Sequence, residues 1–402
     1  MKTKKINLEN WHVFIVIGFV LILSLLSWKS FVKSIGSSLI NKIESGKETN
    51  MHGSVVQDNS ADVEITESTG EKMSAIEKLN TLFEKVTDKV NSTWKIYKNE
   101  KFMQVDSFVS YYGLGEIASP QVLSGKDGWL FYKSETDGNP IADFEGTNGY
   151  TENEMKQIAQ AAVNTQSELE NRGINFSILV APNKENVYAE NMPDGYIHAE
   201  KSSTDILIEY LSNAGVNVVS PKEELLDNHM TSQVYYSYDT HWNQLGAYIG
   251  VCDVLTSWNI NMPKLAERDI LIDNLDGNYH YCGEDDLTRM AGLRSVFSDE
   301  IEYEVDGTVP MDWTDFAVEQ GDGEISHFVN GNANIDGKIF VIGDSFRSSM
   351  IPGLREQFSD VYVVHRLYYS ADMIEEVNPD YIIAEYVERY SSEIKNIEDL
   401  LG

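Results

Sequence analysis

The chain has 402 residues, of which 42% are hydrophobic and 24% charged, a composition typical of a globular protein with an ample core. Its 31 basic and 64 acidic residues give a formal net charge of −33. A surface this acidic repels nucleic acid and anionic membrane, so nucleic-acid binding is excluded as the expected function. Cys252 and Cys282 lie in no Cys-x-x-Cys pair or histidine cluster, so no metal site is expected. The sequence is consistent both with one disulfide between these two cysteines and with two buried free thiols.

The first hundred residues indicate an anchor, a stalk and a helix. We expect a transmembrane anchor over residues 12–31, because an uncharged apolar stretch follows several lysines and has aromatic flanks. A cleavable signal peptide fits less well, since the small residues of a cleavage site are missing. Residues 1–11 would then stay in the cytoplasm. Polar composition predicts a flexible stalk over residues 32–72, and apolar spacings of three and four predict an amphipathic helix within residues 73–101.

The globular part is expected over residues 102–402 and alternates strands with helices. After a turn at 125–128, apolar patterns and end signals predict strands at 129–132, 175–181, 216–219, 338–342, 361–364 and 381–384, and helices at 152–172, 204–214 and 244–258. Residues 295–335 lack clear periodicity, so we expect loops or short antiparallel strands there. Strands that alternate with helices predict an α/β fold with a mostly parallel sheet.

The segment Gly343-Asp344-Ser345-Phe346 follows the predicted strand at 338–342. It places Ser345 at the carboxyl end of a strand and at the start of a helix, where ligands gather in open α/β sheets. Backbone N–H groups at such a position can bind a developing oxyanion. A serine hydroxyl becomes a good nucleophile only when a neighbouring imidazole takes its proton. The alternative interpretation is a simple helix N-cap, for which Ser and Asp are common.

The segment Asp239-Thr240-His241-Trp242 directly precedes a predicted helix. Asp239 stands two residues from His241, so its carboxylate can orient the imidazole as a general base. Trp242 would restrict the ring and exclude water. The alternative is a capping aspartate beside an incidental histidine. If this segment meets Ser345 in space, the three side chains form an acyl-transfer site.

Together these segments resemble the SGNH-hydrolase-like domain of the alginate O-acetylation proteins AlgX and AlgJ, and the related DHHW group of bacterial acetyltransferases. The resemblance rests on the Asp-Thr-His-Trp and Gly-Asp-Ser-Phe boxes, and on shorter segments at 125–132, 181–188, 246–248 and 285–293. It covers roughly residues 105–390. In ordinary SGNH esterases the Asp and His follow the Ser. Here they precede it, as in the AlgX-like group.

The resemblance implies an SGNH-hydrolase-like three-layer sandwich with a catalytic triad. Ser345 would be the nucleophile, His241 the general base and Asp239 the orienting acid. The backbone N–H near Ser345 is the expected main oxyanion donor. Side-chain candidates for oxyanion or substrate contacts are Asn183, Lys184, Arg347 and Trp242, although Lys184 is equally consistent with a surface lysine.

The expected function is that of a membrane-anchored, extracytoplasmic O-acetyltransferase that acetylates a cell-surface or secreted polysaccharide through an acyl-enzyme. No cofactor or metal is expected in this chain. Because acetyl-CoA is absent outside the cell, the resemblance implies that a membrane-bound O-acyltransferase partner supplies the acetyl group. The alternatives are a polysaccharide acetylesterase and a non-catalytic scaffold or polysaccharide-binding subunit of an export complex.

Overall fold

The computed structural model describes residues 107, 111, 117, 119–273, 286–293, 300–310 and 325–402, all within the unit at residues 100–402. The anchor, stalk and amphipathic helix expected before residue 102 lie outside the described residues, as does Cys282. Cys252 is buried with a free thiol. Among the described residues, no helix has both the length and the apolar character needed to cross a membrane.

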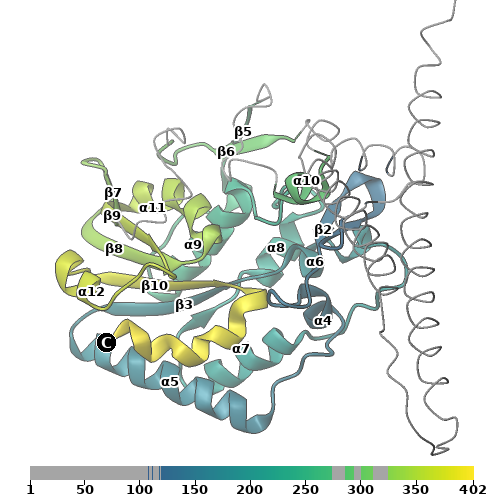
Figure 1. Ribbon diagram of the computed structural model, residues 1–402. Coiled ribbons are helices and arrows are strands. Elements are labelled where there is room, and N and C mark those ends of the chain that lie inside the picture. Colours follow the sequence, from purple (N-terminus) through teal and green to yellow (C-terminus); the bar gives the residue numbers. More distant parts are fainter. Residues whose placement is uncertain are drawn as a thin grey trace, which may run out of the picture. The chain divides into compact units, whose positions relative to one another are not determined.

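A six-stranded sheet forms the centre of the described domain (Figure 1). The strand order is β4-β3-β10-β8-β9-β7. The neighbours β4, β3, β10, β8 and β9 all pair in parallel. At one edge of the sheet, β7 pairs antiparallel with β9. The bounds are β3 (Asn175–Ala181), β4 (Val218–Val219), β7 (Ser326–Val329), β8 (Ile335–Gly343), β9 (Phe358–His365) and β10 (Tyr381–Val387). The expected α/β fold with a mostly parallel sheet is confirmed.

Helices cover both faces of the sheet. They are α4 (Pro140–Phe144), α5 (Glu152–Asn171), α6 (Lys184–Val187), α7 (Ser203–Asn213), α8 (Lys222–Asn228), α9 (Gln244–Ser257), α10 (Asp286–Ala291), α11 (Ile351–Gln357) and α12 (Asp372–Val377). Short 3₁₀ helices are η2 (Lys126–Gly128), η3 (Ala189–Asn191), η4 (Leu265–Glu267) and η5 (Ser345–Met350), and a longer one, η6 (Glu388–Leu400), ends the chain.

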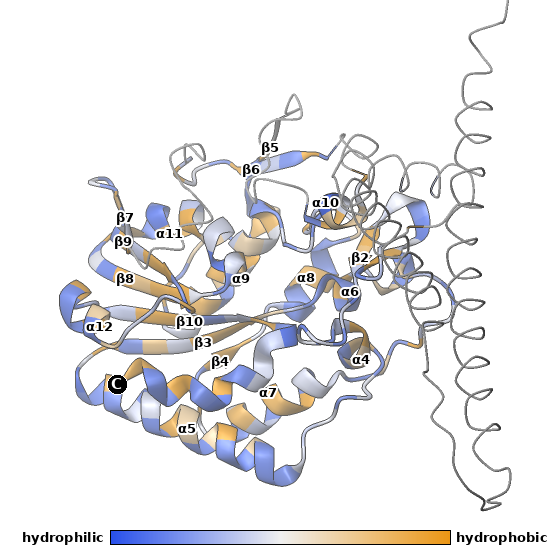
Figure 2. Ribbon diagram, viewed as in Figure 1, coloured by the Kyte–Doolittle hydropathy of each residue, from blue (hydrophilic) through white to orange (hydrophobic). Residues whose placement is uncertain are grey.

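Alternate residues of each strand point into two different cores. Along β3, Ile178 and Val180 pack with α5, α7 and η6, whereas Leu179 and Ala181 pack with α9 and α11. The helix α5 turns its apolar side toward the sheet and its polar side outward (Figure 2). Its start is fixed by a capping box in which Thr151 and Glu154 bond each other's backbone N–H groups. The strand pattern and the caps thus place the helical layers on the sheet.

Two small two-stranded antiparallel sheets flank the central sheet. They are β1 (Val122–Ser124) with β2 (Leu130–Tyr132), and β5 (Ile270–Asp273) with β6 (Glu302–Val305). Leu287, Ala291 and Leu293, in and just after α10, pack on the β1–β2 hairpin. The β6 and β7 strands both lie in the stretch that lacked periodicity, and both pair antiparallel, as expected.

Candidate active site

Ser345 lies where β8 ends and η5 begins, at the carboxyl end of a parallel strand as expected. Asp344 caps this turn: its Oδ1 accepts a hydrogen bond from the Phe346 N–H (3.0 Å). Its Oδ2 accepts one from the N–H of Val387 at the end of β10 (2.8 Å). Asp344 therefore does the capping, and the half-buried Ser345 hydroxyl is directed elsewhere.

The Ser345 hydroxyl meets His241, and His241 meets Asp239. The Oγ of Ser345 lies 2.6 Å from His241 Nε2, although the two residues are 104 positions apart. On the other side of the ring, His241 Nδ1 lies 2.6 Å from Asp239 Oδ1, which also accepts the backbone N–H of His241 (2.9 Å). This is the order of contacts that lets a carboxylate orient a base and the base take a hydroxyl proton.

The charges of His241 and Asp239 depend on one another. Burial lowers the pKa of His241, but the Asp239 carboxylate outweighs this effect, so the pKa stands above the usual 6.5. Burial likewise raises the pKa of Asp239, but His241 outweighs it and lowers that pKa to about 2. Asp239 is therefore ionised at neutral pH and stabilises an imidazolium.

Trp242 joins the base segment to the nucleophile segment. It is fully buried, and its indole N–H donates to the carbonyl oxygen of Phe346 (2.9 Å). The Phe346 ring lies 4.7 Å from the His241 ring between centroids, and the Ser349 hydroxyl donates to the Trp242 carbonyl (3.4 Å). The single N–H of Trp242 is thus already bonded. The structure gives this side chain a bracing position, where a substrate or oxyanion contact was expected.

Lys184 also differs from its expected position as an oxyanion donor or surface lysine. It is buried, and its ammonium group donates to the carbonyl oxygens of Tyr236 (3.1 Å), Ser237 (3.2 Å) and Asp239 (2.7 Å). An ammonium has three protons, and these three bonds use them all. Burial lowers the pKa of Lys184 to about 8. Lys184 therefore holds the loop that carries the acid.

Asn183 and Arg347 lie at the same edge of the sheet. The Nδ2 of Asn183 is buried and has no hydrogen-bond acceptor among the described residues, while its Oδ1 accepts the N–H of Arg389 (3.3 Å). An amide donor without a partner keeps Asn183 a candidate for an oxyanion contact. Arg347 is buried and donates from Nη1 to the carbonyl of Asp344 (2.6 Å), which braces the nucleophile turn.

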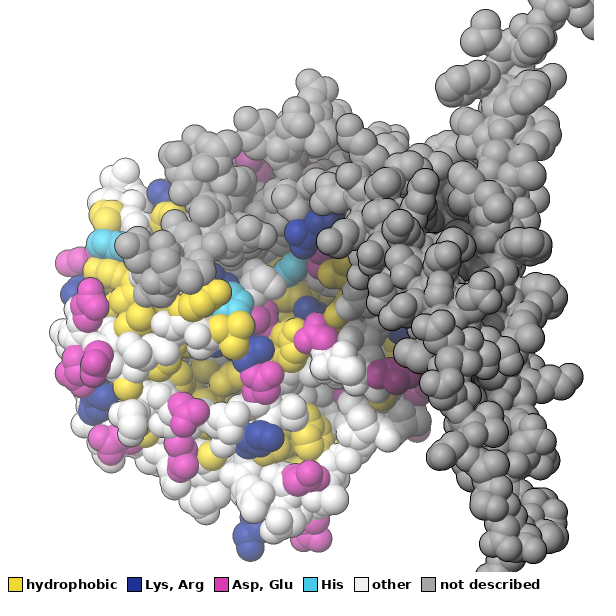
Figure 3. Space-filling model, in the orientation of Figure 1, with side chains coloured by type: hydrophobic (Ala, Val, Ile, Leu, Met, Phe, Trp, Pro, Cys, Tyr) yellow, Lys and Arg dark blue, Asp and Glu magenta, His cyan; other side chains and the backbone are white. Residues whose placement is uncertain are grey.

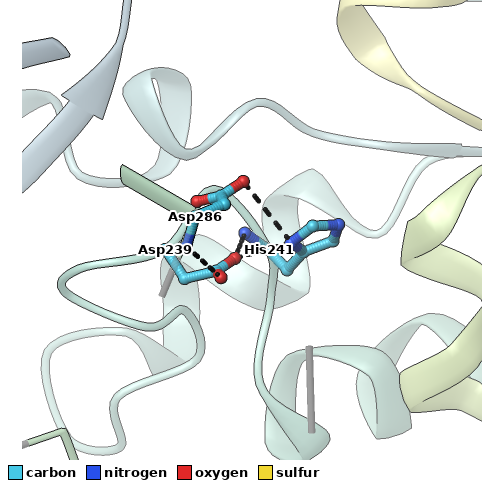
Figure 4. A group of neighbouring side chains, drawn as sticks. All are labelled: Asp239, His241 and Asp286. Atoms are coloured by element: carbon cyan, nitrogen blue, oxygen red, sulfur yellow. Dashed lines mark hydrogen bonds and ion pairs between the residues drawn. The ribbon is translucent and has the colours of Figure 1, made fainter. Parts of the chain in front are cut away.

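Two acidic residues that the sequence did not single out hold the acid loop. Asp286 accepts the Thr240 N–H at Oδ1 (2.8 Å) and the Thr240 hydroxyl at Oδ2 (2.5 Å), and its own N–H donates to Asp239 Oδ2 (2.9 Å; Figure 4). Glu300 accepts the N–H groups of Ser237 (3.0 Å) and Tyr238 (2.7 Å). Their partners lie 46 to 63 positions away. The only signal for Asp286 was its place in a family-like segment.

Asp239, His241 and Asp286 also offer three possible metal ligands close together. Tetrahedral ligands about 2.0 Å from one zinc ion would stand about 3.3 Å apart. The Nδ1 of His241 and Oδ1 of Asp239 are 2.6 Å apart, too close for two ligands of one ion. A hydrogen bond between the two atoms explains this distance, so we interpret the cluster as a hydrogen-bonded relay.

Two further ionisable groups, Arg389 and Glu385, lie near the site. The guanidinium of Arg389 lies over the rings of Tyr132, Phe346 and Tyr390, at 5.6, 5.6 and 5.1 Å from their centroids. Its charge opposes that of the imidazolium and lowers the pKa of His241, a smaller effect than that of Asp239. Glu385, on β10, is fully buried and lies against the nucleophile turn, where it interacts with Asp344.

Comparison with known families confirms the resemblance seen in the sequence. Residues 122–268 match the family described as SGNH hydrolase-like domain, acetyltransferase AlgX. No curated protein matches. Similar solved structures include a DHHW family protein from Eubacterium siraeum, with 16% identity over 70% of this chain and 100% of that one, and a TM-score of 0.47. Bacillus cereus PatB1 has 16% identity over 67% and 96% (TM-score 0.46), and the O-acetyltransferase domain of Pseudomonas putida AlgJ has 15% over 69% and 99% (TM-score 0.41).

Proposed function

Because residues 122–268 match the AlgX family of SGNH hydrolase-like acetyltransferase domains, we propose that this protein is a serine O-acetyltransferase. The observation that carries the proposal is a pair of hydrogen-bond contacts of 2.6 Å each, one between Asp239 and His241 and one between His241 and Ser345. A hydroxyl so close to an imidazole whose far nitrogen faces a carboxylate can be activated for attack on an acyl group.

In the proposed first step, Ser345 Oγ attacks the carbonyl carbon of an acetyl donor while its proton passes to His241 Nε2. The carbonyl oxygen becomes an oxyanion, for which the Ser345 N–H and the Nδ2 of Asn183 are the proposed donors. The intermediate collapses to the acetyl-serine, and His241 returns its proton to the leaving oxygen of the donor. Asp239 stabilises the imidazolium that exists between these transfers.

In the second step the acetyl group moves to a hydroxyl of a sugar. His241, neutral again, takes the proton of that hydroxyl, whose oxygen attacks the acetyl carbon bound to Ser345. When the intermediate collapses, His241 returns the proton to Ser345 Oγ. Water can follow the same route, so the acceptor decides between transferase and esterase activity.

The proposal extends to where the protein works. The lysine-flanked apolar stretch at 12–31 supports an anchor with the domain outside the cytoplasm. There the acetyl group would come from a membrane-bound O-acyltransferase partner, and the acceptor would be a cell-surface or secreted polysaccharide. The family match supports acetyl transfer in general and leaves the polymer open.

The nucleophile can be tested directly on full-length protein. We expect wild type to gain one acetyl group when incubated with p-nitrophenyl acetate, detected by intact mass, and Ser345→Ala to gain none. The exposed Ser370→Ala serves as the matched control. In the native host, Ser345→Ala should remove the acetate that mild base releases from the extracellular polymer. Unchanged acetate would contradict the transferase, and faster hydrolysis than transfer to added oligosaccharides would favour the esterase.

A further inference from the structure

Asp286 lies beside the acid and base but comes from a separate element. It opens α10, whose Leu287 is fully buried against the β1–β2 hairpin. Its carboxylate lies 4.0 Å from His241 Nδ1, against 2.6 Å for Asp239. Asp239 is therefore the orienting acid, and Asp286 reaches the base through the groups that it holds and through its charge.

We propose that Asp286 is a positioning residue that assembles the acid–base pair, an inference that rests on the proposed function. Its carboxylate holds Thr240 by both the N–H and the hydroxyl, and its N–H holds the second oxygen of Asp239. Thr240 stands between Asp239 and His241 in sequence. Fixing Thr240 therefore fixes the backbone of both neighbours at once.

The burial of Thr240 makes these bonds costly to lose. Thr240 is 5% exposed, and without Asp286 its hydroxyl would keep only the long contact with His241 Nδ1 (3.4 Å). A buried donor without an acceptor is strongly unfavourable, and the loop would move to find another arrangement. A displacement of about 1 Å at a general base is enough to reduce turnover severely. Correct placement of His241 thus depends on α10 being docked.

Asp286 also contributes charge. The charged groups that face His241 are Asp239, Asp286 and Arg389, of which the two carboxylates favour the imidazolium and the guanidinium opposes it. A helix-capping role does not account for the Asp286 carboxylate, because both of its oxygens are bonded to Thr240. The positioning role and the charge predict different effects, which substitution can separate.

The first experiment compares Asp286→Asn with the exposed Asp227→Asn in the full-length protein, using p-nitrophenyl acetate. Asparagine keeps one acceptor for Thr240 and loses the other together with the charge. We expect kcat to fall about tenfold, with little change in KM, because a bond to a charged group is lost. The midpoint of the acidic limb of the kcat–pH profile should move to lower pH. Wild-type kcat and an unshifted midpoint in Asp286→Asn would overturn the proposal.

A second pair of variants isolates the bond to Thr240. Thr240→Ser keeps the hydroxyl and should retain most of the activity, whereas Thr240→Val removes it and should lower kcat as Asp286→Asn does. Equal activity of the two variants would overturn the proposal. The His241 titration, followed by NMR of the imidazole protons, gives a readout independent of turnover. If wild type shows no acetyl transfer or hydrolysis, the proposed function fails, yet a displaced His241 imidazole signal in Thr240→Val, which keeps the Asp286 charge, would still support the positioning role.

Discussion

The protonation of His241 is the residue-scale property on which the proposed chemistry depends. Burial and Arg389 lower its pKa, while Asp239 and Asp286 raise it, and the carboxylates prevail, so the pKa lies above 6.5. Only the neutral ring can accept a proton from Ser345. Activity must therefore be lost as pH falls through the folded-state pKa and be regained above it.

We accordingly predict that kcat of the wild type rises with pH through a midpoint above 6.5. Asp239→Asn removes the main charge that holds this pKa up, so the midpoint should move to lower pH. It should also reduce kcat by roughly 10³–10⁴, since the base loses its orientation. Steady-state hydrolysis of p-nitrophenyl acetate between pH 5 and 9 measures both effects. A midpoint that stays where it is in wild type would show that another group titrates.

The residues of the relay could be predicted from sequence, but the residues around it could not. Asp239, His241 and Ser345 carry a chemistry that is recognisable in short local motifs. Lys184 and Trp242 were also noticed, but their partners lie 52 to 55 and 104 positions away. A sequence pattern does not show which carbonyl a lysine will meet. Their bracing positions are therefore visible only in the folded chain.

At the scale of elements, prediction succeeded where the segment was long or strongly apolar. The strand at 175–181 was predicted with its observed bounds, and the helix at 152–172 ends one residue earlier in the structure. The short helices α4, α6 and α8 were not predicted, because four to seven residues contain too few turns to establish a helical period. One of them, α6, begins with Lys184.

The close approach of β8 and β10 positions the nucleophile turn. A Cβ on Gly343 would lie 2.3 Å from Glu385 Oε2 and 2.7 Å from Glu385 Cβ, distances that force the two strands apart. Glu385 is fully buried and cannot swing into solvent. Burial and the charge of Asp344 raise its pKa well above the usual value, which favours a neutral carboxyl. Only glycine fits at position 343.

We predict that Gly343→Ala lowers the free energy of unfolding by about 1–3 kcal/mol, typical of overpacking, and lowers kcat because Ser345 moves with the strand end. Gly337→Ala on the same strand is the matched control. Its Cβ would lie 3.3 Å from Ile335 Cγ2 and 3.4 Å from Asp380 Oδ2, which small shifts can absorb. Urea unfolding and ester hydrolysis measure the two effects. Equal losses in both variants would contradict a special role for this contact.

At the scale of the whole molecule, the site depends on the order of the strands. The last strand, β10, lies between β3 and β8, so the chain end closes the sheet beside the nucleophile. Parallel strands could be inferred from alternating strands and helices, but their order could not, because every apolar strand fits a central position. In this arrangement the loop with Asp239 and His241 reaches Ser345.

The net charge of −33 gives a prediction about the acceptor. Acidic side chains are spread over the visible face of the domain (Figure 3), so a polyanionic acceptor is repelled over long distances. Raising the salt from 0.01 to 0.15 M shortens the screening length from about 30 to 8 Å. We therefore expect kcat/KM for a polyuronate oligosaccharide to rise with salt, and that for its carboxyl-reduced, neutral form to stay constant. Acetyl transfer from p-nitrophenyl acetate to each oligosaccharide measures this. A polyuronate that reacts faster at low salt would instead indicate that cationic groups such as Arg389 attract the acceptor locally.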